Sequence, residues 1–177
     1  MRRFLHRHQA PAPRRAIALA AFGAFAAVAA VGAANAYGPW PLLVAPFGAS
    51  CALLFAARAS PLAQPSAVLG GHLVSTAIAL ALRSILPDVW WAAALAVALA
   101  IAAMLWLRVL HPPGAADPLV VFALDPGLDF LLTPMLFGAL ALVLLATAYH
   151  RLTGAAYPLP HPEATRRRAA QRAHVEP

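Results

Sequence analysis

The chain has 177 residues, of which 62% are hydrophobic and 11% are charged, whereas soluble domains carry roughly a quarter charged residues. A water-soluble fold of this size would lack the polar surface to cover itself, so the composition predicts an integral membrane protein. All 13 basic residues are arginines and ten of them lie before the first apolar stretch or after the last, a distribution that fits anchoring at anionic lipid and argues against nucleic-acid binding.

The chain begins with a basic tail, residues 1–15, followed by the uncharged stretch 16–36. At 1.5 Å per residue this stretch is long enough to cross a hydrocarbon core of about 30 Å. It ends in Ala34-Asn35-Ala36, which also resembles a signal cleavage site. Its apolar part exceeds the roughly 7–15 residues usual in a signal, so we favour a retained span.

The next apolar segment, 41–57, is short, and Pro39, Pro41, Pro46 and Gly48 interrupt any helix that would fill it. It is predicted to be a re-entrant or broken helix. A full fifth span is the alternative.

Segment 65–82 is as long as a span but carries polar residues. His72, Thr76, Ala79 and Arg83 recur at helical spacing and form one stripe. The stripe is either a water-lined path that attracts an anion or relays a proton, or a polar seam bonded to neighbouring helices. In the same segment Gly71 and Ser75 give the small-xxx-small spacing of close helix packing.

Two further uncharged stretches, 89–107 and 130–149, complete the predicted domain 16–152. Trp90, Trp91 and Trp106 lie at the ends of the first and are read as interfacial anchors. A basic tail, 153–177, follows and is expected to be disordered.

Arginine counts choose between the two layouts, because the cytoplasmic loops of membrane proteins are rich in Lys and Arg. Five spans would leave seven arginines inside and six outside. With 41–57 re-entrant, both tails and Arg83 lie inside, and the split is eleven against two. Four spans are therefore predicted, with both termini in the cytoplasm and the acidic loop of Asp117, Asp125 and Asp129 outside.

Two Pro/Gly breaks, 45–50 and 111–116, share the pattern P-x-G-A followed by a small residue and lie 66 residues apart. They suggest the remnant of an internal repeat of the kind that transporters use. A half-helix that starts at Gly48 or Gly114 would direct N–H donors at an anion, with Arg108 and His111 adding charge. The alternative is that the prolines only end helices.

No enzyme motif is present, and neither a metal nor a cofactor is predicted. Two minor alternatives stay open. Ser50 near His72 suggests an intramembrane hydrolase. Cys51 together with His72, His111 and Asp117 suggests a metal conduit. If neither holds, Cys51 is a small core residue.

Three motifs in the same order resemble those of the HPP family of small membrane proteins. They are 46–50 (PFGAS), 60–65 (SPLAQP) leading to 70–72 (GGH), and 111–115 (HPPGA), and the resemblance covers roughly 40–151. The resemblance implies four membrane helices and a transporter; some plant and cyanobacterial members are linked to nitrite transport.

The chain departs from the family pattern at two places. It has Ser66-Ala67 where Arg-Asn is expected, and Gly114-Ala115 with Asp117 soon after where the motif runs on into Gly-Gly. Losing a cation and adding a carboxylate weakens an anion site, which bears on nitrite as the substrate more than on transport itself.

The sequence thus predicts an all-α, polytopic helix bundle in a bacterial inner membrane that transports a small solute, with an inorganic anion such as nitrite as the example. The alternative is a non-transporting subunit or scaffold. Expected partners are membrane lipid, the solute and further copies of the chain in a homo-oligomer. The predicted pathway is lined by Pro46, Phe47, Gly48, Ser50, Gln64, Gly71, His72, Thr76, Arg108, His111, Pro112, Pro113 and Gly114.

Overall fold

A computed structural model describes residues 5–7, 9–39 and 41–160, and every regular element in that part of the chain is a helix, as predicted. Among the described residues, three helical stretches are long and apolar enough to cross a membrane, and two more apolar helices are shorter. The prediction of a disordered tail falls mostly on 161–177, outside the described residues. The long stretches are Arg14–Tyr37, Pro65–Arg83 and Leu128–Leu152, and the shorter ones Pro46–Ala56 and Trp90–Trp106.

Helix α1 (Arg14–Tyr37) defines two ends of the bundle: a proximal end, where it begins, and a distal end, where it stops. The chain then turns back without regular structure to α2 (Pro46–Cys51), which continues as the π-helical turn η1 (Ala52–Ala56).

This first broken segment follows α1 over most of its length. Near the distal end the Leu43 N–H donates to Asn35 Oδ1 at 3.3 Å. Near the proximal end the Phe55 ring packs against Gly23, and Arg58 lines one pocket together with Arg15. The segment is therefore a broken helix, which was one of the two predicted forms. It is not re-entrant, because it runs from one end of the bundle to the other.

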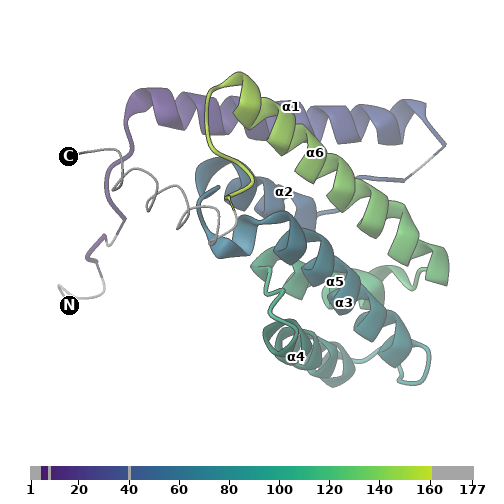
Figure 1. Cartoon of the computed structure of the whole chain (residues 1–177). Coiled ribbons are helices and arrows are strands. Elements are labelled where there is room, and N and C mark those ends of the chain that lie inside the picture. The colour runs from purple at the N-terminus through teal and green to yellow at the C-terminus, as the bar shows by residue number, and fades with distance from the viewer. Residues whose placement is uncertain (1–4, 8, 40, 161–177) are drawn as a thin grey trace.

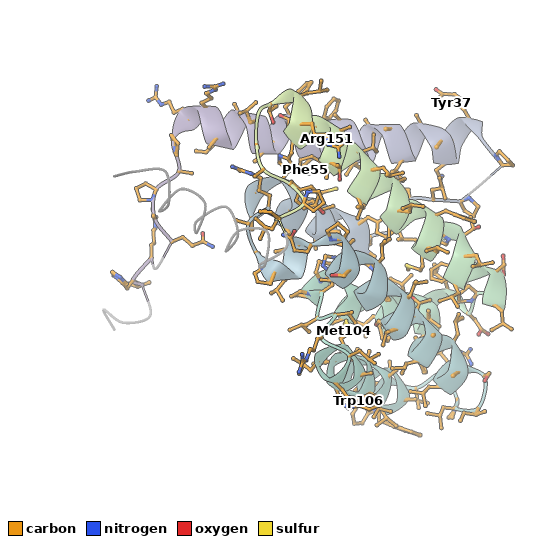
Figure 2. All side chains as sticks on the ribbon, viewed as in Figure 1. Tyr37, Phe55, Met104, Trp106 and Arg151 are labelled. Atoms are coloured by element: carbon orange, nitrogen blue, oxygen red, sulfur yellow. The ribbon has the colours of Figure 1, made fainter. Side chains whose placement is uncertain are left out.

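Helix α3 (Pro65–Arg83) runs from the proximal to the distal end, and α4 (Trp90–Trp106) returns beside it (Figure 1). The buried face of α4 has one residue per turn, three alanines and then a methionine. Small residues at this spacing let two helices approach closely. Met104 is fully buried in this face while Trp106 is 83% exposed (Figure 2). The buried residues are Ala92, Ala96, Ala100 and Met104.

A second broken segment follows α4. Arg108 turns the chain in the left-handed conformation with φ of 59°, and the helix η3 (Pro112–Ala116) leads directly into α5 (Asp117–Leu124). Asp125, just after α5, pairs with Arg83 at the distal end of α3, with 2.9 Å between Nη2 and Oδ2. The second broken segment therefore also reaches the distal end.

This ion pair corrects the predicted layout. The four-span arrangement placed Arg83 and the acidic loop on opposite sides of the membrane, whereas the structure joins Arg83 to Asp125 directly. The prediction separated these two residues because it treated the stretch after 107 as loop, whereas helical turns from Pro112 to Leu124 lead the chain to the distal end.

The chain closes with η4 (Leu128–Leu131), η5 (Leu132–Leu136) and α6 (Phe137–Leu152), which returns to the proximal end. There the Tyr149 hydroxyl donates to the Leu19 carbonyl at 2.8 Å. The fold thus has two successive halves of three passes, each with an unbroken helix as its first pass, a broken second pass and a helical third pass (Figure 1). The halves start from opposite ends, because α1 begins at the proximal end and α4 at the distal end.

Candidate functional site

Six buried polar side chains gather where the two broken segments meet α3. Ser50 comes from α2, His111 and Asp117 from the second broken segment, and the other three from α3. All six are 0% exposed. A buried polar group surrounded by apolar helices is costly unless it finds partners, so the hydrogen bonds of this network decide what it can do. The α3 members are His72, Ser75 and Thr76.

Ser50 is the centre of the network. Its Oγ lies 2.9 Å from Nε2 of His72 and 2.9 Å from Nε2 of His111, and 3.3 Å from the Pro46 carbonyl one helical turn earlier. Ser50 therefore connects α3 to the turn before η3, although 22 and 61 residues separate it from the two histidines.

Each histidine is also bonded through its second ring nitrogen. Nδ1 of His72 lies 2.9 Å from Oδ2 of Asp117, and the Thr76 hydroxyl donates to the same oxygen at 3.2 Å. Nδ1 of His111 lies 2.8 Å from the Leu62 carbonyl. Oδ1 of Asp117 is buried and has no partner in the described part of the chain. A continuous chain thus runs from Asp117 through His72, Ser50 and His111 to Leu62.

Glycines allow the second break to lie directly on α3. A Cβ built on Gly71 would lie 2.5 Å from Cβ of His111, and one built on Gly114 would lie 3.1 Å from the Gly71 carbonyl carbon. The Ser75 hydroxyl donates to the Gly114 carbonyl at 2.6 Å, and the same oxygen accepts the backbone N–H of Asp117. The predicted close packing at Gly71 and Ser75 is confirmed, with the η3 turn as the partner.

Most predicted pathway residues meet at or beside this network. Phe47 stacks edge-on against the His72 ring, with centroids 5.2 Å apart. Both breaks also border one open apolar groove of about 880 Å³. The predicted residues in or bordering the network and groove are Pro46, Phe47, Ser50, Gly71, His72, Thr76, His111, Pro112, Pro113 and Gly114.

Three predicted pathway residues lie elsewhere or contribute no polar contact. Arg108 is exposed, and no Cβ built on the exposed Gly48 would meet any atom within 4 Å. The Gln64 amide is engaged outside the network: Nε2 donates to the carbonyls of Arg58 and Ser60, and Oε1 accepts from the Leu159 N–H. Gln64 therefore fastens the turn before α3 to the chain that follows α6.

The predicted cradle of free N–H donors is not formed. The Phe47 and Gly48 N–H groups donate to the Val44 and Ala45 carbonyls, and the Gly114 N–H to the His111 carbonyl. The following helix, α5, begins with the carboxylate of Asp117. Because local turns satisfy these donors, the site consists of a carboxylate, two imidazoles and hydroxyls. No group of three His, Cys, Asp or Glu side chains in the described residues is placed to hold a metal ion.

The predicted pathway did not include Asp117 or the Leu62 carbonyl, although the metal-conduit alternative grouped Asp117 with His72 and His111. Asp117 carried a signal, since it is the only acidic residue between 89 and 124, yet it was assigned to an external loop. The Leu62 carbonyl carried none, because a backbone acceptor leaves no mark on the residue type.

Residues 9–158 match the family described as HPP, transmembrane region. This match covers most of the chain, and the chain belongs to that family, as the three motifs indicated. Two proteins similar to this chain are transmembrane proteins of Dictyostelium discoideum, 36% identical over 113 residues and 37% identical over 112. Each alignment covers 59% of this chain but only 40% and 36% of the relatives, respectively. No solved structure matches the chain significantly.

Proposed function

We propose that this protein carries a small solute across the membrane at the contact between its two broken segments. The observation that carries the proposal is the fully buried polar network at that contact, within helices that are otherwise apolar. Interrupted helices leave backbone groups that lipid cannot satisfy, and transporters place such interruptions around a solute site near the middle of the membrane. Two halves that start from opposite ends also fit the inverted repeats of many transporters.

The finer topology that we propose has six crossings. If all three passes of each half cross the membrane, Arg58 and Arg108 join both tails on the proximal side, and Arg83 is alone on the distal side. The split of arginines is then twelve against one, sharper than the eleven against two of the four-span layout. By the positive-inside rule the proximal end is cytoplasmic.

The solute class follows from the charges of the site. The network contains one carboxylate and no arginine, so it does not favour an anion that stays fully charged in the site. It suits a small solute that forms hydrogen bonds or takes up a proton. Nitrite, the conjugate base of a weak acid, meets this description and is the first solute to test.

Uptake into proteoliposomes tests the function. The purified protein should give saturable nitrite uptake above that of protein-free vesicles, and His72→Ala and His111→Ala should each reduce it about tenfold or more, since each removes a link of the network. Thr147→Val is the matched control, because the Thr147 hydroxyl bonds only within α6, to the Val143 carbonyl.

The same experiment can overturn the proposal. If neither nitrite nor nitrate nor other small ions and weak acids move faster than through empty vesicles, the scaffold alternative is favoured. Normal uptake by both histidine variants would retain transport but remove this network from the pathway.

One observation favours a second candidate, a hydrolase. Asp117, His72 and Ser50 are linked in the order and by the atoms of an acid–base–nucleophile triad, with both contacts at 2.9 Å. Against it, Ser50 is 0% exposed and its Oγ also contacts His111. A fluorophosphonate probe distinguishes the two: the transporter predicts no labelling at Ser50, and labelling that Ser50→Ala abolishes would support the hydrolase.

A further inference from the structure

The network contains more hydrogen-bond acceptors than its side chains can supply with donors in their usual protonation states. Carbonyl oxygens only accept, so the contact with Leu62 places a proton on Nδ1 of His111. An ionised Asp117 places one on Nδ1 of His72 in the same way. If both rings are neutral, both Nε2 atoms are bare acceptors, and the one Ser50 proton faces two nitrogens at 2.9 Å and the Pro46 carbonyl at 3.3 Å. At least one nitrogen contact would then join two acceptors.

One additional proton removes this conflict. With a proton on Nε2 of His72, this ring donates to Ser50 Oγ, and Ser50 donates to Nε2 of His111. Every link from Asp117 to Leu62 then has one donor and one acceptor. The same proton balances the charge of the ionised Asp117, and a buried pair without net charge is far less costly than an isolated carboxylate.

We propose that this network holds one mobile proton, which passes between His72 and His111 through the Ser50 hydroxyl and couples solute movement to proton movement. The coupling rests on the proposed transport function. The bound proton does not, because it follows from the donor and acceptor count of the network alone.

The transfer step is balanced and needs no other reactant. The N–H bond of Nε2 on His72 breaks as Ser50 Oγ takes that proton, and the Oγ–H bond of Ser50 breaks as Nε2 of His111 takes the other. The step leaves Ser50 unchanged, turns His72 neutral and makes His111 the imidazolium. The two ring centroids are 5.0 Å apart, so the positive charge moves from α3 to the second break without rearrangement of the helices.

Few other titratable groups face the network from the elements packed around it. Cys51 follows Ser50 on α2 and is buried. The α4 and η5 segments have no titratable side chain within their bounds, and Asp117 is the only one in α5. His150 on α6 bonds instead to the Leu54 carbonyl, and Arg83 on α3 to Asp125. The proton count therefore depends on His72, His111 and Asp117.

Nitrogen NMR of the ¹⁵N-histidine-labelled protein tests the bound proton, because the shift of a ring nitrogen reports whether it carries hydrogen. His72→Gln and His111→Gln assign the signals. Near pH 7 we expect three of the four nitrogens of these rings to be protonated in the wild type. In Asp117→Asn, which removes the carboxylate that stabilises the imidazolium, we expect two. Two protonated nitrogens, both Nδ1, would overturn the bound proton, and two with Nε2 of His72 protonated would place the proton on Asp117 and overturn the relay between the histidines.

Coupling is measured in nitrite-loaded vesicles with a pH-sensitive dye inside. Outward nitrite flux should change the internal pH in the wild type and in Thr147→Val. Ser50→Ala changes the side-chain volume little but removes the hydroxyl that relays the proton. The internal pH change in vesicles with this variant should therefore fall about tenfold or more. Circular dichroism and a sharp elution peak check that Ser50→Ala is folded.

The outcomes separate the two proposals. Nitrite flux without a pH change, or with an unaltered pH change in a folded Ser50→Ala, overturns the relay and leaves transport standing. No flux of any solute overturns the transport function and the coupling with it, whereas the NMR spectra still decide whether the network holds the proton.

Discussion

At the scale of single residues, two glycines allow the second break to contact α3. Gly71 leaves no room for a side chain and Gly114 leaves little, whereas the exposed Gly48 of the first break has open space around it. The same Pro-x-Gly-Ala pattern therefore has different packing requirements at its two occurrences.

This difference predicts that Gly71→Ala lowers stability and Gly48→Ala does not. A methyl group at position 71 would overlap the Cβ of His111, and overpacking a tight site costs about 1–3 kcal/mol. In Gly48→Ala the extra helix propensity, up to about 1 kcal/mol, is the main effect. Thermal unfolding midpoints in one detergent compare the two variants. Equal midpoints for wild type and Gly71→Ala would show that α3 and the second break are not in close contact.

Residue spacing predicted part of the site. Positions 72 and 76 fall on one face of any helix, so the His72 and Thr76 stripe followed from the sequence. The contact between Ser50 and His111 did not, because it joins residues 61 apart and depends on how two broken segments pack.

At the scale of elements, the sequence indicated where helices break but not where the chain goes next. Pro46 and Pro112 begin short helices, as their fixed φ favours. Each broken segment has fewer helical residues than a span needs, so length alone favoured a loop or a re-entrant turn. The tertiary contacts of Asn35, Phe55 and Asp125 show that both segments instead travel between the two ends.

The pairing of α3 with α4 makes a matched prediction about two alanines on α4. Ala96 is fully buried and Ala94 is exposed. Ala96→Leu should destabilise the protein by about 1–3 kcal/mol, because three more carbon atoms must fit a close helix contact. Ala94→Leu should change stability by less than about 0.5 kcal/mol. Denaturation of both variants in detergent provides the comparison, and equal stability would contradict the packing of α4 through its alanine face.

At the scale of the whole molecule, the proposed six-crossing topology differs from the predicted four-span layout by two crossings. Every crossing reverses the side on which the following loop lies. Two additional crossings therefore move the loops between them to the other side and leave both tails on one side, in keeping with the contact between Tyr149 of α6 and Leu19 of α1. The arginine count favours both layouts, because both place the ten arginines at the two ends of the chain inside. Only Arg58, Arg83 and Arg108 change side between four spans and six crossings.

The central claim is that two opposed halves cross the membrane six times and meet at their broken passes. Single cysteines at three loops distinguish the layouts by reaction with an impermeant maleimide in intact bacterial cells that express the protein. The wild type is the blank, because Cys51 is 1% exposed. Six crossings predict that Asp88→Cys and Leu128→Cys react from outside and that Ala59→Cys reacts only after permeabilisation. Four spans would instead expose Ala59→Cys and Leu128→Cys and protect Asp88→Cys, and five spans would expose Asp88→Cys alone; either pattern would contradict the account.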